Sequence, residues 1–298
     1  MTPRPGWNGA PVGRLAVIGV GQIGGSVALA ARATGAVGEV VGYARSAETL
    51  QRAQALGIID RAAPSAGEAA RGAALVVLAT PVRSLAALAA AIAPSLAAEA
   101  VVFDVGSVKA PVLRAVEPIL SAAAASFVAC HPVAGTERAG PEAASATLFD
   151  ARPCVLCPTA VTSAAALALV TRLWRAFGCE VLTMDASVHD RVLGACSHLP
   201  HAAAYALAAA VGAADPAVQE QIGKLMTTSL RDTTRVAASN PAMWRDILLD
   251  NGGEVLPALD RLLGELGRLR AAIAAGDGDG LEKLLAAGKQ SRDRLIPG

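Results

Sequence analysis

The sequence is poor in aromatic side chains, which make up 3% of its 298 residues. Proteins that bind single-stranded nucleic acid stack the bases on aromatic rings, so this scarcity argues against such a function. The sequence also has no large excess of positive or negative charge, because 26 Lys and Arg residues are balanced by 25 Asp and Glu residues. The net charge of +1 provides no overall field to attract a polyanion, and we expect no nucleic-acid partner.

Long hydrophobic runs are also absent. Alanine-rich stretches such as residues 84–98 are interrupted, in this case by Pro94, and none reaches the length of a membrane span. Residues 1–13 are rich in Gly and Pro and lack the apolar core of a signal peptide. We therefore expect a cytoplasmic protein that does not contact a membrane.

The five cysteines are odd in number and fit no zinc-ribbon spacing. Cys154 and Cys157 form a C-x-x-C, but they lie in an apolar segment of strand character, whereas redox-active pairs favour the N-terminus of a helix. His189, His198 and His201 lack the Cys or acid that would complete a plausible zinc site. The sequence therefore predicts buried, reduced thiols and no metal.

The first 183 residues alternate between β-branched segments and helical segments. A chain of 298 residues is long enough to form two domains, and its 53% of hydrophobic residues suffice for a large core. Alternating strands and helices predict an α/β fold, a Rossmann-type doubly wound parallel sheet. The expected strands are residues 14–18, 40–43, 75–80, 101–105, 127–130, 153–157 and 180–183. Helices are expected from residue 22, over residues 47–56, 81–92 and 163–177, and between the strands 101–105 and 127–130.

The pattern changes near residue 184, after which only amphipathic helical segments remain. They cover residues 187–211, 217–238, 242–249, 255–275 and 281–294. We predict a dinucleotide-binding domain over residues 1–185 and an all-helical domain for substrate binding and dimerisation over residues 186–298. The Ala-rich and Leu-rich faces of these helices suit the interface of a homodimer.

A glycine-rich hexapeptide follows the first strand directly and precedes a helix. Residues 19–24, GVGQIG, match G-x-G-x-x-G in the context that makes this pattern specific for a dinucleotide. Gly19 permits the tight turn, Gly21 lets the backbone approach the pyrophosphate, and Gly24 lets the helix pack on the strand. We expect the cofactor contacts to be Gly19, Gly21, Gln22, Ile23 and Gly24, with Thr80 and Pro81 at the end of the strand 75–80.

The end of the second strand bears on the choice between the two nicotinamide cofactors. An acid in this place would bind the ribose 2′-hydroxyl of NAD, but the sequence has Ala44 there. Arg45 and Ser46, which follow, offer a cation and a hydroxyl to a 2′-phosphate. This pattern favours NADP, or at least permits it beside NAD. If Arg45 is only a solvated charge, dual specificity remains.

Four segments carry the polar residues that an active site needs. GSVK (106–109) and HPVAGTE (131–137) each follow a predicted strand, so Ser107 and His131 lie at the edge where doubly wound sheets bind ligands. The helical half supplies residues 189–201, HDRVLGACSHLPH, and residues 231–244, which end in TRVAASNPAMW.

Taken together, these segments resemble the prephenate/arogenate dehydrogenase family of tyrosine biosynthesis, over residues 15 to about 250. The resemblance implies an NAD(P)-dependent oxidative decarboxylation of a cyclohexadienol, prephenate or arogenate, a small carboxylated substrate. Ala44 departs from the acid that many relatives carry. The residues do not decide between prephenate and arogenate.

The resemblance also implies roles for single residues. His131 is the catalytic histidine, as its near-neutral pKa suits a general base, and Ser107 hydrogen-bonds to it or to the ring hydroxyl. Arg235 holds a substrate carboxylate, for which a guanidinium fork is suited. Asp190 orders the pocket through ion pairing. The expected lining of the substrate pocket is completed by His201, Thr136, Glu137 and Ser197.

Alternatives remain open at this point. Only the resemblance separates Arg235 from Arg231 on the same helical face, and His131 alone could cap a strand end structurally. A 3-hydroxy-acid dehydrogenase or a pyrroline-carboxylate reductase would share the two-domain plan, and the former would use a helical lysine, for which Lys224 is the candidate. A non-catalytic dinucleotide sensor would lack a proton acceptor, and His131 argues against it.

Overall fold

A computed structural model describes residues 7–136 and 138–296 of the chain, so Glu137 lies outside the described residues. The chain divides into two compact units, residues 1–251 and residues 252–298. The first unit holds the whole sheet and the helices up to α11, and it carries the candidate site.

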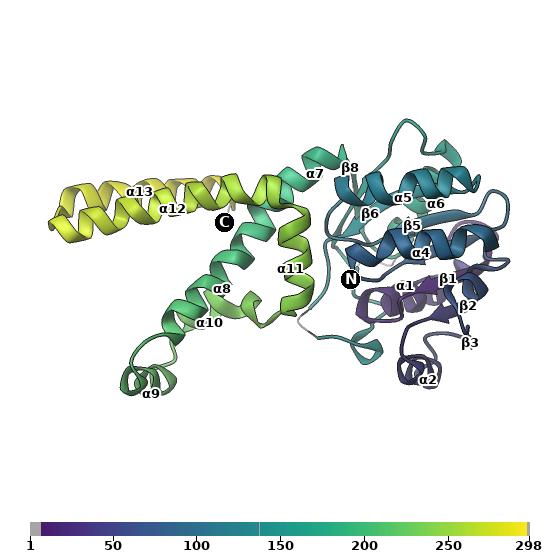
Figure 1. The fold of residues 1–298 in the computed structure, drawn as a ribbon, viewed down its shortest axis with the longest axis horizontal. Helices are drawn as coiled ribbons and strands as arrows, with labels where there is room; N and C mark the ends of the chain where they lie inside the picture. Colours follow the sequence, from purple (N-terminus) through teal and green to yellow (C-terminus); the bar gives the residue numbers. More distant parts are fainter. Residues whose placement is uncertain (1–6, 137, 297–298) are drawn as a thin grey trace. The chain divides into compact units, whose positions relative to one another are not determined.

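An eight-stranded sheet in the order β3-β2-β1-β4-β5-β6-β7-β8 forms the centre of the first unit (Figure 1). This confirms the predicted Rossmann-type fold. The strands are β1 (Val12–Ile18), β2 (Val37–Tyr43), β3 (Arg61–Ala62), β4 (Leu75–Leu78), β5 (Val101–Asp104), β6 (Ser126–Pro132), β7 (Pro153–Cys157) and β8 (Glu180–Thr183).

One strand pairing differs from a purely parallel sheet. β7 runs antiparallel to β6, with His131 paired with Val155. The residues described between these two strands hold only a short 3₁₀ turn, Pro141–Ala143, and no α-helix of the kind that usually connects parallel strands. β3 was not predicted because two residues carry no periodic signal.

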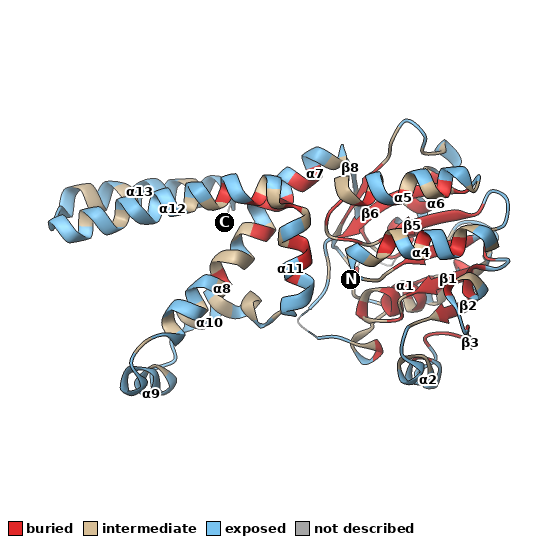
Figure 2. Cartoon of the chain, viewed as in Figure 1, coloured by how far each residue is buried: buried red, intermediate tan, exposed pale blue. Residues whose placement is uncertain are grey.

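Helices α1 (Gln22–Ala33), α2 (Ala47–Ala55), α3 (Ala66–Ala70), α4 (Leu85–Ile92), α5 (Ala110–Ala122) and α6 (Ala164–Ala176) connect the strands. The strands at the centre of the sheet are buried (Figure 2) because two hydrophobic clusters cover its faces. The few aromatic residues are concentrated there, since the ring of Trp174 meets those of Phe103, Phe149 and Phe177 edge to face. Four cysteines are buried as expected, but Cys196 is exposed.

Helices follow β8, and none of the residues described beyond Thr183 forms a strand. They are α7 (Ala186–Leu193), α8 (Leu199–Gly212), α9 (Pro216–Lys224), α10 (Thr228–Thr234) and α11 (Pro241–Asp250). The helix predicted over residues 187–211 is interrupted by a π-helical turn, Gly194–His198. The helix predicted over residues 217–238 ends at Lys224, and Thr227 then caps α10 by accepting from the Leu230 N–H. The domain boundary at residue 185 stays a prediction.

The second unit is a pair of helices, α12 (Gly252–Ala275) and α13 (Gly278–Leu295). Gly276 adopts a left-handed φ of +64° in the turn between them, and Asp277 caps α13. Several large apolar side chains on both helices are exposed in the single chain, among them Leu256, Leu263, Leu266, Ile273 and Leu285. Within the described ranges, no helix has the length and apolar character that a membrane crossing requires.

Candidate active site

The glycine-rich loop joins β1 to α1 in the geometry that the sequence predicts. Gly19 has a φ of +107°, and a Cβ atom there would collide with the Ala79 carbonyl. A Cβ atom on Gly24 would collide with the Gly19 carbonyl, so helix and strand pack closely only with glycine. A Cβ atom on Gly21, in contrast, would meet nothing within 4 Å. The loop thus leaves open space at the N-terminus of α1, which fits the pyrophosphate of a dinucleotide.

The other predicted cofactor residues surround this loop. Thr80 lies directly against Gly19, since a Cβ atom on that glycine would be 2.7 Å from the Thr80 Cγ2 atom. Pro81 is exposed and precedes the 3₁₀ turn Val82–Ser84 that leads into α4. After β2, Arg45 is exposed, and Ser46 caps α2 by accepting from the Thr49 N–H at 3.3 Å. Because Ser46 only accepts in this contact, its hydroxyl proton can still be donated to a ligand.

A buried ion pair ties the ends of β5 and β6 together. Lys109 Nζ lies 2.5 Å from Asp104 Oδ2, and both side chains are fully buried. Lys109 also donates to the Cys130 carbonyl at 2.7 Å, while Asp104 accepts from the N–H groups of Cys130 and Gly106. Sequence reasoning missed this pair, although an Asp ending an apolar strand five residues before a Lys was a visible signal.

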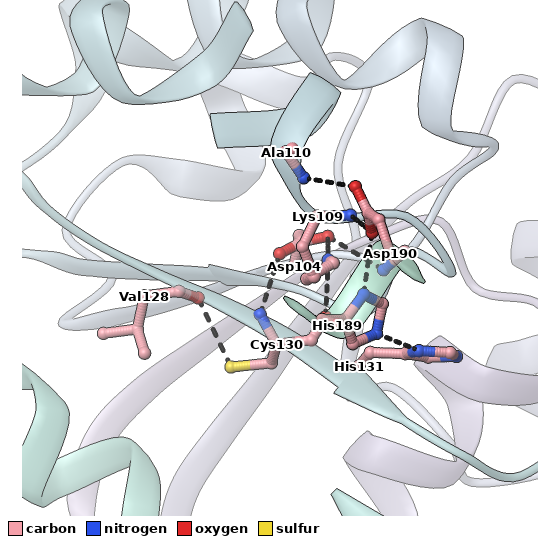
Figure 3. Close-up of polar contacts among 9 residues, drawn as sticks. Asp104, Lys109, Ala110, Val128, Cys130, His131, His189 and Asp190 are labelled. Carbon is pink, nitrogen blue, oxygen red and sulfur yellow. Dashed lines mark hydrogen bonds and ion pairs between the residues drawn. The ribbon is translucent and has the colours of Figure 1, made fainter. Parts of the chain in front are cut away.

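Two histidines and an aspartate form a hydrogen-bonded chain beside this ion pair (Figure 3). His131, at the end of β6, and His189, on α7, are joined by 2.8 Å between Nδ1 of the first and Nε2 of the second. His189 Nδ1 lies 2.8 Å from Asp190 Oδ1. Both imidazoles are buried. His189 was not among the predicted site residues.

Asp190 also caps α5, which begins 80 residues earlier in the sequence. Its carboxylate accepts from the backbone N–H groups of Lys109 and Ala110, at 2.7 Å and 2.8 Å. Burial raises the pKa of Asp190, but the hydrogen bonds from His189 and from these two N–H groups outweigh burial and lower the pKa. Asp190 is therefore an anion at the positive end of a helix, and its partners are an imidazole and backbone amides.

The charge of Asp190 determines which nitrogens carry protons. A carboxylate only accepts, so His189 Nδ1 must donate to it, and the other nitrogen of a neutral His189 must accept. His131 Nδ1 is then the donor to His189, which leaves the His131 Nε2 lone pair free. Burial lowers the pKa of His131 well below its usual value, and the neighbouring His189 and the Lys109 charge lower it further. His131 is thus a neutral imidazole, held in one tautomer.

A second group of side chains comes from the π-helical turn, α8 and α11. Asn251 Nδ2 donates to His198 Nδ1 at 2.9 Å and to the Asp190 carbonyl at 2.8 Å. Burial lowers the pKa of His198 to about 4. His198 therefore helps to connect α7 with the end of α11 as a buried neutral group.

His201 stacks on Trp244, with ring centroids 3.5 Å apart and an interplanar angle of 19°. His201 Nδ1 donates to the Ser197 carbonyl at 2.9 Å, so its Nε2 is free when the ring is neutral. Burial lowers the pKa of His201, and the positive charge of Arg235 adds to this effect. The buried Trp244 indole N–H has no hydrogen-bond partner among the described residues. Trp244 was missed as a single residue, although it lies in a motif noted in the sequence.

The remaining predicted residues lie as follows. Ser107 is half-buried in the turn between β5 and α5. Arg235 is exposed and begins the 3₁₀ turn after α10. Thr136 is hydrogen-bonded to Gln22, a contact that sequence reasoning did not predict. Lys224, the lysine considered for a 3-hydroxy-acid dehydrogenase, is exposed on α9 and pairs with Glu220 at 2.6 Å.

Two family models cover most of the chain. Residues 27–183 match the nucleotide-binding domain of prephenate dehydrogenase, and residues 185–287 match its dimerization domain. The chain belongs to the prephenate dehydrogenase family. This confirms the resemblance and identifies an oxidoreductase that uses a nicotinamide dinucleotide.

Individual relatives agree with this assignment. The cyclohexadienyl dehydrogenase of Zymomonas mobilis is 40% identical, over 89% of this chain and 90% of its own length. The crystal structure of prephenate dehydrogenase from Aquifex aeolicus, in complex with hydroxyphenyl propionate and NAD⁺, has a TM-score of 0.85 at 34% identity and covers 95% of this chain and 98% of its own. Arogenate dehydrogenase from Synechocystis has a TM-score of 0.78 at 27% identity and covers 95% of this chain and 100% of its own.

Proposed function

We propose that this chain catalyses the NAD(P)-dependent oxidative decarboxylation of prephenate or arogenate in tyrosine biosynthesis, yielding 4-hydroxyphenylpyruvate or tyrosine. The observation that carries the proposal is the chain of hydrogen bonds from Asp190 through His189 to His131. It ends in a neutral imidazole at the end of β6, at the sheet edge where the glycine loop also lies. A family member with these features has both a proton acceptor and a dinucleotide site.

The glycine loop and the N-terminus of α1 would hold the pyrophosphate, with Thr80 and Pro81 beside it. NAD(P)⁺ bound there supplies the hydride acceptor. The substrate hydride comes from the ring carbon that bears the hydroxyl, and the ring carboxylate leaves as carbon dioxide. The electrons of the broken carbon–carbon bond complete the aromatic ring.

His131 controls the proton of the ring hydroxyl. Its free Nε2 takes this proton while the hydride leaves, and returns it to the phenolate oxygen after carbon dioxide has departed. The reaction therefore neither consumes nor releases a proton. The positive charge that forms on His131 in between is one imidazole away from the Asp190 carboxylate, which stabilises it. His189 and Asp190 act as positioning residues.

The substrate carboxylates and side chain would be bound from the helical part of the unit. Arg235 supplies a cation beside His201, whose ring is held by stacking on Trp244. Ser107, Thr136 and Ser197 offer hydroxyl groups, and Glu137 completes the proposed pocket. These roles are proposals that rest on position and on the family.

The test of the function is a matrix of initial rates, measured through the absorbance of the reduced nicotinamide. Prephenate and arogenate are each combined with NAD⁺ and with NADP⁺, and a 3-hydroxy acid serves as the control substrate. We expect turnover with at least one of the first two and none with the 3-hydroxy acid. Turnover of the 3-hydroxy acid alone would contradict the proposal.

Replacing Arg235 tests the proposed carboxylate anchor. We expect Arg235→Gln to raise the substrate KM at least tenfold while changing kcat less, because a carboxylate contact is present in ground state and transition state alike. The matched control is Arg231→Gln, one turn earlier and exposed on α10. A raised KM in the control with an unchanged KM in Arg235→Gln would show that Arg231 is the anchor.

The pH dependence of kcat/KM tests the neutral state of His131. A general base must be unprotonated, so activity falls as the pH falls through its pKa. Because burial and the Lys109 charge lower the pKa of His131, we expect kcat/KM to stay constant from pH 8 down through 6.5 and to fall only well below that value. An acid limb centred at or above pH 6.5 would contradict this environment.

We infer that NADP is accepted at least as well as NAD, because Ala44 cannot repel a 2′-phosphate and the exposed Arg45 can pair with it. We expect Ala44→Asp to shift the ratio of kcat/KM values toward NAD by tenfold to a hundredfold, or about 1–3 kcal/mol. Both cofactors are measured at saturating substrate, with Ala44→Asn as the uncharged control. A strong preference for NAD in the unaltered chain that Ala44→Asp does not change would show that another residue contacts the ribose.

The working assembly is proposed to be a homodimer. The match to a dimerization domain supports this, as do the apolar side chains exposed on α12 and α13. The cytoplasmic location stays a prediction from the sequence.

A further inference from the structure

Gln22 is the first residue of α1, and its side chain does not extend toward solvent. It is buried against the loop that follows β6, which contains Thr136. Two hydrogen bonds join the pair: the Thr136 backbone N–H donates to Gln22 Oε1 at 3.0 Å, and Gln22 Nε2 lies 2.6 Å from Thr136 Oγ1. The side-chain amide of Gln22, in the predicted dinucleotide loop, is thus hydrogen-bonded to both the backbone and the side chain of Thr136, in the predicted substrate loop.

Chemistry determines the direction of both bonds. A backbone N–H can only donate, so the atom facing it must be the Gln22 oxygen, and the amide nitrogen must then donate to the Thr136 hydroxyl. That hydroxyl also accepts from the Arg138 N–H at 3.2 Å. With both acceptor positions used, the Thr136 hydroxyl can only donate its proton to a further partner. Such a group binds an oxygen acceptor and not an ammonium.

The loop is shaped for this contact. Gly135 has a φ of +138°, which other residues rarely adopt, and it directs the next N–H group toward Gln22. A Cβ atom on Gly135 would be 3.5 Å from Gln22 Oε1. Farther along, the Ser145 N–H donates to Ser26 Oγ on the same helix at 2.9 Å. The segment is therefore attached to α1 at two separate points.

We propose that Gln22 couples cofactor binding to the order of the substrate loop and is a positioning residue for Thr136. The backbone of Gln22 lies in the first turn of α1, where a bound pyrophosphate would restrain it, and the side chain of the same residue would then be restrained too. Whatever stabilises Gln22 then stabilises the loop. By linkage, an ordered loop strengthens cofactor binding by the same factor. The consequence for substrate binding rests on the proposed function, but the coupling itself does not.

Hydrogen exchange at the Thr136 amide tests the coupling without substrate. In the unaltered chain we expect saturating NAD⁺ or NADP⁺ to slow this exchange at least fivefold. Gln22→Met keeps the length of the side chain and removes both hydrogen bonds. It should exchange at Thr136 about tenfold faster without cofactor. At saturation the cofactor, bound about fivefold more weakly because the coupling is reciprocal, should slow exchange less than twofold. Gln22→Leu serves as a second variant if Gln22→Met does not fold.

The matched control is Ser26→Ala, which releases the Ser145 amide and should leave the protection of Thr136 unchanged. Two results would overturn the proposal: no effect of either cofactor on Thr136 exchange in the unaltered chain, or cofactor protection of Thr136 that persists in Gln22→Met. In turnover assays, Gln22→Met should raise the substrate KM about tenfold with kcat within threefold, and Thr136→Ser should keep a normal KM while Thr136→Val does not. Absence of turnover in the unaltered chain would instead contradict the proposed function, and the exchange result would still decide the coupling.

Discussion

His131→Asn is expected to lower kcat by about 10²–10⁴-fold, the usual loss when a general base is removed. Asparagine retains a polar group at the end of β6, but an amide cannot take a proton at neutral pH. The Kd of the cofactor should remain within threefold, because the loop proposed to bind the pyrophosphate lies between β1 and α1, whereas His131 lies at the end of β6. Single-turnover rates and cofactor titrations measure the two quantities separately.

His198→Asn is the matched control for this change. His198 is also a buried neutral imidazole, but its Nδ1 accepts from Asn251 and it is not part of the chain of hydrogen bonds to Asp190 Oδ1. We expect kcat to fall less than tenfold in this variant. Near-native turnover in His131→Asn would remove His131 from the mechanism, and an equal loss in both variants would indicate a general effect on packing.

Removing one partner of the buried Asp104–Lys109 pair is expected to cost about 3–5 kcal/mol of unfolding free energy, because the other charge is left buried without compensation. Asp104→Asn keeps the shape of the side chain, removes its charge and replaces one of its two accepting oxygens with a donor. The loss should appear as a lower urea midpoint with an unchanged slope. The double variant Asp104→Asn/Lys109→Met leaves neither of these two charges in the core and should recover part of the loss.

The control for this ion pair is a surface pair in the same unit. Arg14 and Glu39 are 2.7 Å apart and both partly exposed, so Glu39→Gln should cost less than about 1 kcal/mol. A double variant less stable than Asp104→Asn alone, or a loss below about 1 kcal/mol in the single variant, would show that the buried pair does not stabilise the chain in the way its geometry indicates.

The sequence by itself determined those features that depend on neighbouring residues. A β-branched run followed by GVGQIG specifies a strand, a tight turn and a helix within 15 residues, since the need for glycine is a matter of local sterics. The same local logic placed His131 at the end of a strand and showed where strands cease, near residue 183. The order of the motifs then sufficed to predict the family.

Only the tertiary structure decided which distant residues meet. Asp190 caps α5, which begins 80 residues earlier, and His189 orients the imidazole of His131, 58 residues away. Gln22 is hydrogen-bonded to Thr136, 114 residues further along the chain. The antiparallel β7 and the π-helical turn that displaces α8 likewise have no periodic signature in the sequence. The physical reason is that hydrophobic periodicity reports which face of an element is buried, whereas a polar contact between distant elements depends on how those elements pack in three dimensions.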